Sequence, residues 1–220
     1  MTDKKVIDVY WSFNSPWSYL ATPRLVKWQE EYELQINFKQ VYPIAIRTPD
    51  FFQEVNPQWF SYFGLDVRRV AEFLGLPFAQ PRPGPISFEL REGRPWPAAD
   101  QPHIFRLSRL GLLTDELGHG LAFADRVSRL IWGGTNGWDE GDHLDLICKE
   151  LGLNLEELDN RANDEHQRLD DIIEANNQAL TQAGHWGVPT CVFNGEPYFG
   201  QDRLDVLLWT LKRNGLQARS

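Results

Sequence analysis

Cysteine is scarce in this chain of 220 residues, which contains only Cys148 and Cys191. Two cysteines so far apart do not indicate a disulfide framework, and a Cys-x-x-Cys redox pair is absent. Cys191 falls on a predicted core strand and Cys148 lies among apolar neighbours, so we expect both thiols to be buried packing groups. The chain therefore offers no reactive dithiol of its own.

Long apolar runs, excess positive charge and metal-ligand patterns are also missing. No apolar stretch approaches the ~18 residues that span a bilayer, and the start, Met-Thr-Asp-Lys-Lys, has no cleavage signature, so we expect a cytoplasmic protein. The net charge of −9 argues against nucleic acid or an anionic membrane as the main partner. None of the five histidines has a spacing such as His-Glu-x-x-His, so no metal site is predicted.

Aromatic residues, in contrast, are abundant. The chain has nine tryptophans and thirteen phenylalanines, and 42% of its residues are hydrophobic. A chain of this length forms one domain with an elaboration, or two small domains. We expect broad apolar surfaces that include a ligand pocket. A few well-placed arginines are enough to hold a small anionic ligand there.

Strand patterns occur at the two ends of the chain. Residues 5–13 predict a buried strand, residues 16–32 a helix and residues 34–42 a second strand, which together form a parallel strand–helix–strand unit. Residues 188–200 predict a hairpin that turns at an Asn-Gly pair. A final amphipathic helix follows, with Asp202 as its N-cap.

The middle of the chain shows helical periodicity and no convincing alternating strand between about residues 45 and 182. The predicted helices cover residues 58–74, 98–117, 119–132, 139–152 and 154–182, the last as one or two helices. The sequence therefore predicts a helical block between a β-α-β opening and a β-β-α ending.

The segment Ser15-Pro16-Trp17-Ser18 lies where the first strand turns into the first helix. Ser15 is a suitable N-cap, and Pro16 suits the first helical position. The helix end carries partial positive charge, which in thiol–disulfide enzymes stabilises a cysteine thiolate at this corner. Here serines take the Cys-x-x-Cys positions. By itself the segment is typical of a helix cap. Because it contains no cysteine, any sulfur at this corner must come from elsewhere.

Two further motifs give the chain a specific resemblance. Trp186-Gly187-Val188-Pro189-Thr190 resembles the cis-proline loop of the thioredoxin superfamily, and Phe199-Gly200-Gln201-Asp202-Arg203-Leu204 opens the last helix. Together with the Ser15 segment they resemble the 2-hydroxychromene-2-carboxylate isomerase and kappa-class glutathione transferase branch of the DsbA-like family. The resemblance implies an α/β, thioredoxin-like fold from residues 1–44 and 183–220, with residues 45–182 as an inserted all-helical domain.

The resemblance also implies a function. The chain would be a cytoplasmic, homodimeric, glutathione-dependent isomerase of aromatic catabolism, acting on a conjugated aromatic substrate. Ser15 would stabilise the glutathione thiolate, and the backbone at Val188 and Pro189 would pair with the peptide. Asp202 would bind the γ-glutamyl ammonium group, while Gln201 and Arg203 suit its carboxylate. A kappa-like transferase and a DsbA-like thiol- or peptide-binding module without Cys-x-x-Cys activity are the alternatives.

The substrate side departs from the family pattern, which has Gly-Asn-x-Pro-Pro after the second strand. Asn56 is the candidate for that asparagine, and Arg47 is either a contact for a substrate carboxylate or a surface residue. Trp17 and Ser18 complete the predicted substrate contacts. The aromatic residues Trp59, Phe60, Tyr62 and Phe63 either pack in the core or, as in the family, line the cleft between the domains.

Overall fold

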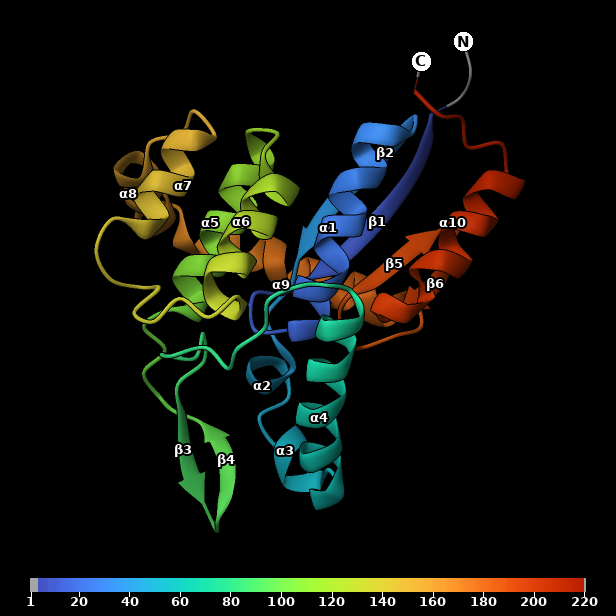
Figure 1. Cartoon of the computed structure of the whole chain (residues 1–220). Helices are drawn as coiled ribbons and strands as arrows, with labels where there is room; N and C mark the ends of the chain where they lie inside the picture. The colour runs from blue at the N-terminus through green and yellow to red at the C-terminus, as the bar shows by residue number, and fades with distance from the viewer. Residues whose placement is uncertain (1–3, 220) are drawn as a thin grey trace.

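The computed structural model describes residues 4–219, and its central feature is a four-stranded sheet (Figure 1). The strand order is β2 (Leu34–Gln40), β1 (Lys5–Trp11), β5 (Thr190–Phe193), β6 (Glu196–Phe199). β1 and β2 are parallel, β5 is antiparallel to β1, and β6 is antiparallel to β5. This topology confirms the predicted β-α-β opening, the terminal hairpin and the thioredoxin-like α/β fold.

Helix α1 (Pro16–Glu31) connects β1 to β2, as predicted. Its buried face includes Tyr19, Leu20 and Leu25, which are all fully buried, and it packs against α6. The chain ends in a 3₁₀ turn, η1 (Gln201–Arg203), followed by α10 (Leu204–Arg213). The prediction that Asp202 is the N-cap of this helix is wrong: Asp202 lies inside the 3₁₀ turn and pairs with Arg203 at 3.0 Å.

Five helices follow one another in the second part of the middle region: α5 (Ile104–Glu116), α6 (Gly120–Trp132), α7 (His143–Glu150), α8 (Leu155–Asp164) and α9 (His166–Gln182). Each corresponds to a predicted helix, and residues 154–182 divide into two. Helix α5 begins six residues later than predicted. The reason lies at Gln101, whose side chain bonds the backbone of Ser87 and Ala98 and holds residues 98–101 in a loop.

Residues 44–97 differ most from the prediction. They contain α2 (Ile44–Arg47), α3 (Phe51–Glu54), α4 (Pro57–Phe73) and a hairpin of β3 (Phe88–Arg91) and β4 (Arg94–Pro97). The prediction of no strand between residues 45 and 182 is wrong at this hairpin. Phe88-Glu89-Leu90-Arg91 alternates apolar and polar residues over only four positions, and no residue of either strand is buried. Its turn has positive φ at Glu92 and Gly93.

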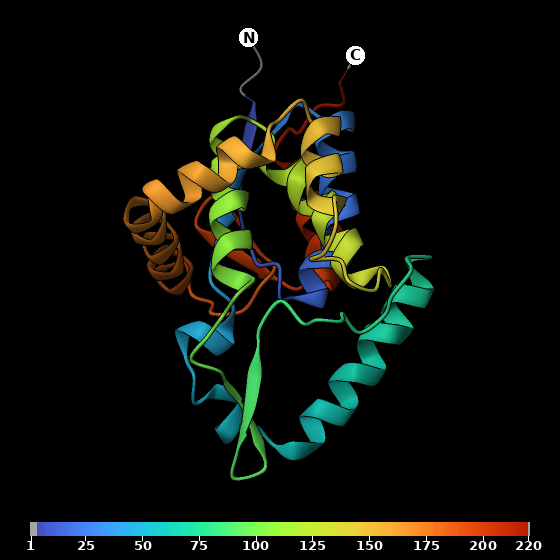
Figure 2. The same ribbon diagram turned by 90° about the vertical axis from the view of Figure 1, so that its left-hand side faces the viewer.

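The two parts of the middle region lie in different places (Figures 1 and 2). The helices α5 to α9 lie beside the sheet, and α5 and α9 both contact β2. The segments α2, α3, α4 and the β3–β4 hairpin project beyond the end of the sheet. Strands and helices share one hydrophobic cluster, whose largest fully buried side chains include Trp11, Trp138 and Tyr19. The division into residues 1–44 with 183–220 and residues 45–182 stays a prediction.

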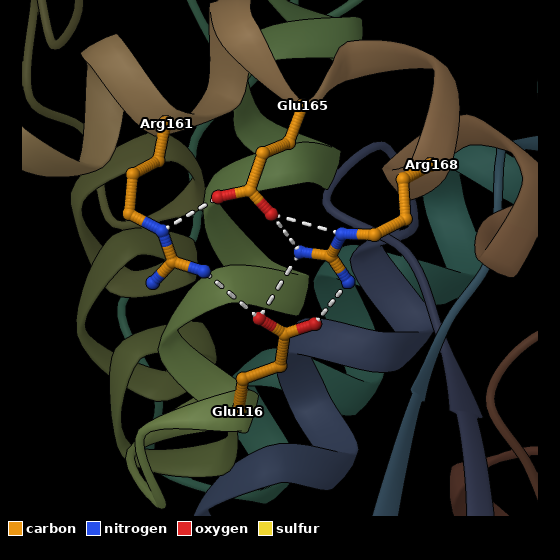
Figure 3. Close-up of polar contacts among 4 residues, drawn as sticks. All are labelled: Glu116, Arg161, Glu165 and Arg168. Atoms are coloured by element: carbon orange, nitrogen blue, oxygen red, sulfur yellow. Dashed lines mark hydrogen bonds and ion pairs between the residues drawn. The ribbon is translucent and has the colours of Figure 1, made fainter.

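An ion-pair network joins the end of α5 to the junction of α8 and α9 (Figure 3). Arg168 contacts Glu116 at 2.6 Å and also pairs with Glu165. Arg161 contacts Glu165 at 2.8 Å and Glu116 at 3.3 Å. All four side chains are between about one-third and two-fifths exposed, so each pair adds little stability by itself. The network therefore links α5 to the junction of α8 and α9 through partly exposed ion pairs.

Asp115, in the last turn of α5, is expected to make stability depend on pH. Burial is the main reason that its pKa rises to about 6; nearby Glu116 raises it further and Lys39 opposes the rise. Because the folded-state pKa is above the unfolded one, the folded protein is destabilised above pH 6 and regains stability as the pH falls towards 4. Asp115→Asn should therefore raise stability at pH 7.5 by about 1 kcal/mol, allowing for solvent screening.

Thermal unfolding followed by circular dichroism at pH 7.5 and pH 4 measures this difference. Most of the gain should disappear at pH 4, where the folded wild type carries the proton and the carboxyl of the unfolded chain, with its ordinary pKa of 3.8, is partly protonated. Asp100→Asn, at an exposed position before α5, is the matched control and should not change the profile. An Asp115→Asn gain that is equal at both pH values would contradict this explanation.

Candidate functional site

Ser15 lies at the corner between β1 and α1 and makes two hydrogen bonds. Its Oγ accepts from the backbone N–H of Ser18 at 3.1 Å, which is the predicted N-cap interaction. The same hydroxyl donates to the backbone C=O of Val188 at 3.1 Å. Ser15 therefore caps α1 and also joins it to a loop 173 residues later in the chain.

That loop contains the Val188–Pro189 peptide, which is cis. Its neighbours are fixed by local bonds: Gly187 N–H donates to His185 Nδ1 at 2.9 Å, and Thr190 Oγ1 donates to Gly187 C=O at 2.7 Å. Within residues 4–219 the N–H of Val188 has no acceptor. The resemblance implied that the Val188 backbone pairs with a peptide, but its C=O already accepts from Ser15. A free backbone donor thus lies beside the Ser15 hydroxyl.

The third predicted segment begins at Gly200, where a positive φ of 96° favours glycine. A Cβ there would lie 2.5 Å from Asp202 Oδ1. The side chain of Asp202 is 58% exposed and pairs only weakly with the equally exposed Arg203. Gln201 was predicted to bind a carboxylate, but its side-chain oxygen and its backbone C=O both accept from Arg24. Its side-chain oxygen is therefore occupied, whereas its Nε2 amide group, the donor that a carboxylate needs, has no acceptor within residues 4–219.

These three segments meet at a cavity of about 1220 Å³. Its polar side includes Asn14, Ser15, Trp17, Val188, Gln201 and Asp202. Part of its aromatic lining, which we call the aromatic wall, consists of Phe51, Phe52, Trp59, Phe60, Phe63, Phe88 and Trp186. Pockets that hold one drug-sized ligand have volumes of about 300–1,000 Å³, so this cavity has room for two small molecules side by side.

The aromatic wall is a continuous set of rings from α3, α4, the β3–β4 hairpin and the cis-proline loop. Trp59 stacks on Phe63 with centroids 4.7 Å apart, and Phe63 meets Trp17 edge-on at 5.8 Å. Phe51 contacts Trp186 at 5.4 Å, so α3 reaches the cis-proline loop. None of the seven rings is fully buried. The structure thus places all four predicted aromatic residues, Trp59, Phe60, Tyr62 and Phe63, on the cavity.

Arg47 lines the same cavity, so it is not a free surface residue. Its Nε donates to Tyr42 C=O at 2.7 Å and its Nη2 donates to Trp186 C=O at 2.8 Å. Burial lowers the pKa of its guanidinium, with an opposing effect from Glu174. Within residues 4–219 no carboxylate lies within 4.0 Å of it. Arg47 thus presents a positive charge that no neighbouring acid pairs with.

Trp17, another predicted substrate contact, also lines the cavity, but Ser18 and Asn56 do not. Ser18 is fully buried behind Ser15, and Asn56 caps α4 by accepting from the N–H of Gln58 at 3.0 Å. Arg203 and Pro189 also lie outside the lining. The sequence reasoning missed Asn14, which lines the cavity and whose side chain has no partner in the described part of the chain. Its position directly before Ser15 was the available signal.

The cavity contains no thiol from this chain. Cys148 and Cys191 are both free and buried, as predicted. Burial raises the pKa of Cys148 to about 11 and that of Cys191 to about 12, so both stay protonated at neutral pH. Residues 4–219 contain no group of three or more histidine, cysteine or acidic side chains that could hold a metal ion. Over the same residues, no helix is long and apolar enough to cross a membrane.

Comparison with known proteins gives consistent results. Residues 6–212 match the family described as DSBA-like thioredoxin domain. The 2-hydroxychromene-2-carboxylate isomerase of Pseudomonas putida is 24% identical over 208 residues, which is 92% of each chain. A solved structure of a 2-hydroxychromene-2-carboxylate isomerase matches with a TM-score of 0.70 and 23% identity over 94% of this chain and 95% of that one.

A second solved structure is similar at lower identity. The cytosolic disulfide reductase DsbM from Pseudomonas aeruginosa, with GSH, matches with a TM-score of 0.61 and 19% identity. The match covers 94% of this chain and 99% of that one. At these identities, likeness to the solved structures establishes the fold alone.

Proposed function

The chain belongs to the DSBA-like thioredoxin domain family, and from this premise we propose that it is an isomerase that uses glutathione and acts on a conjugated aromatic substrate. The isomerase relative from Pseudomonas putida, similar along nearly the whole chain, supports the reaction type. The observation that carries the proposal is the cavity, which joins a serine-capped helix end, a free cis-proline-loop donor and an aromatic wall, without any thiol of the chain.

The polar side of the cavity fits glutathione. The unpaired N–H of Val188 suits a peptide carbonyl, as in the addition of a short strand to an exposed edge. The exposed carboxylate of Asp202 suits an ammonium group. The similarity to the structure of DsbM with GSH supports glutathione as a ligand for a chain of this fold. Arg203 contributes less than the sequence suggested, because it lies outside the cavity, whereas Gln201 lines the cavity and keeps its Nε2 amide donor free within the described residues.

Glutathione, when bound, supplies a thiol nucleophile, which is the chemistry that the buried cysteines of the chain cannot provide. Ser15 stands at the positive end of α1, where negative charge is favoured. Its hydroxyl donates to Val188 C=O, and rotation about one bond would redirect it to an anion in the cavity. The N–H of Trp17 has no acceptor within the described residues and adds a second donor. Ser15 thus acts as an anion stabiliser and not as the nucleophile.

The substrate side of the proposal rests on the aromatic wall and on Arg47. Flat conjugated rings stack well on a wall of half-exposed aromatic side chains. Arg47 offers a guanidinium that lacks a carboxylate partner, so it suits an acidic group on the substrate. Its two bonds to backbone carbonyls fix the position of that charge.

Asp202→Asn should weaken the binding of glutathione on the order of tenfold, because it removes the charge that faces the ammonium group. Isothermal titration calorimetry with glutathione measures the change. Asp171→Asn, on the exposed face of α9, is the matched control and should bind as the wild type does. Equal affinity of Asp202→Asn and the wild type would contradict this assignment of Asp202.

A second measurement separates the candidate reactions. An isomerase changes the absorbance of an aromatic substrate without net consumption of glutathione, whereas a transferase consumes one glutathione for each product. A wild type that binds glutathione without turnover of any conjugated substrate would favour the thiol- or peptide-binding module. A wild type that does not bind glutathione would overturn the proposal.

A further inference from the structure

Arg24 connects α1 to the turn that contains Gln201 and Asp202. Its Nη2 donates to the backbone C=O of Gln201 at 2.5 Å and to the side-chain oxygen of Gln201 at 2.6 Å. Its Nη1 lies 3.8 Å from Asp205 Oδ1. Arg24 follows Ser15 by nine residues, which is about 13 Å along the helix. One helix therefore holds both the cis-proline loop and the Gln201 turn.

The contacts of Arg24 are poorly explained as a source of stability. Its side chain is 25% exposed, burial lowers the pKa of its guanidinium, and its Nε is buried without a partner in the described chain. Its carboxylate neighbour, Asp205, is 87% exposed and at the edge of ion-pair distance, so the charge is weakly compensated. The guanidinium of Arg24 donates to two neutral oxygens of one residue, Gln201, and so fixes the geometry of Gln201.

Gln201, which Arg24 holds, is joined to Asp202 by the next peptide bond of the chain. Because a trans peptide is planar, the N–H of Asp202 points opposite to the C=O of Gln201, and so away from Arg24. Within residues 4–219 this N–H has no acceptor. Gln201 and Asp202 line the cavity, whereas Arg24 does not, so the free donor is on the cavity side of the turn.

We infer that Arg24 is a positioning residue that holds the Gln201–Asp202 peptide so that its N–H serves the cavity as a donor for a carboxylate. The carboxylate and the ammonium group of an α-amino acid would then be read by the N–H and the side chain of the same residue, Asp202. This inference rests on the proposed function, in which that amino acid is the γ-glutamyl end of glutathione. In this arrangement Gln201 supplies the two oxygens that accept hydrogen bonds from Arg24.

The test compares three ligands by calorimetry: glutathione, γ-glutamylcysteine, and cysteinylglycine, which lacks the γ-glutamyl group. Arg24→Leu should weaken the first two about tenfold and leave cysteinylglycine unchanged. Arg24→Lys, which cannot hold both oxygens of Gln201 as a planar fork does, should recover only part of the loss. Arg126→Leu, which removes an arginine that pairs with Glu150 on another face, is the matched control and should change none of the three.

A measurement without ligand keeps the inference separate from the proposed function. Nuclear magnetic resonance relaxation of the Gln201 and Asp202 amides should show a rigid turn in the wild type and a mobile one in Arg24→Leu. An equal loss for all three ligands, or an unchanged turn in Arg24→Leu, would overturn the positioning role. If the wild type does not bind glutathione but Arg24→Leu still makes the turn mobile, the proposed function is overturned. Arg24 would then remain the residue that orders the turn.

Discussion

Ser15→Ala should lower the turnover number of the proposed isomerase about 10²–10³-fold, which is the largest functional effect we expect. Removal of one preorganised donor to a developing or bound anion has effects of this size. The hydroxyl is well placed for this task because it lies at the end of α1 and on the cavity. The pKa of the bound thiol should rise in the variant, since the anion loses a hydrogen bond. Thiolate absorbance in the ultraviolet, together with the turnover number, measures both changes.

Ser15→Ala should also lower the folding stability, because Ser15 has a structural role. Ser15 caps α1 and donates to Val188, so its replacement by alanine should cost about 1 kcal/mol of folding stability. Asn154→Ala removes a comparable N-cap from α8, away from the cavity, and should lower stability without loss of turnover. Ser15→Thr keeps a hydroxyl and should recover most of the activity. Wild-type turnover and an unchanged thiol pKa in Ser15→Ala would contradict the role of Ser15.

The fold could be predicted from the sequence where burial leaves a pattern. β1 is a nearly continuous apolar run because both of its sides are buried, with Val9 and Trp11 in the shared core and Tyr10 in a second cluster. Helix α1 carries apolar residues at helix spacing because one of its sides faces the shared core. The β3–β4 hairpin could not be found in this way, because neither strand has a buried side. The two short helices α2 and α3 were missed for a similar reason, since only Ala45 among their eight residues is buried.

The residues of the candidate site could be predicted where they belong to short sequence motifs. Ser15, Val188 and Asp202 were predicted because each belongs to a short motif, and the structure brings all three to one cavity. Arg24 gave no signal, because its partner Gln201 is 177 residues away and nothing near Arg24 marks the contact. Ser18 shows the opposite error: its place in the motif suggested access, but the helix turns its side chain into the core.

Gly187→Ala should destabilise the protein by about 1–3 kcal/mol and weaken glutathione binding at the same time. The added Cβ would lie 2.5 Å from Phe199 Cε2, 3.0 Å from Phe199 Cζ and 3.1 Å from His185 Cε1. Gly187 does not have a positive φ, so the expected effect is one of space and not of backbone strain. Thermal unfolding and calorimetry measure the two losses.

A movement of the Phe199 ring that relieved the clash would cost energy, because that ring stacks on His185 with centroids 4.0 Å apart. A shift of the backbone instead would move Val188, whose N–H is the proposed peptide donor, so stability and binding should fall together. In Gly187→Ala with Phe199→Ala the clash disappears, and the two substitutions should cost less together than the sum of their separate effects. Gly64→Ala, in α4 with no atom within 4 Å of its Cβ, should instead stabilise the protein by about 0.5–1 kcal/mol. Additive losses in the double variant would show that Gly187 is not held by the Phe199 ring. The position of the cis-proline loop would then depend on its hydrogen bonds with Ser15, His185 and Thr190.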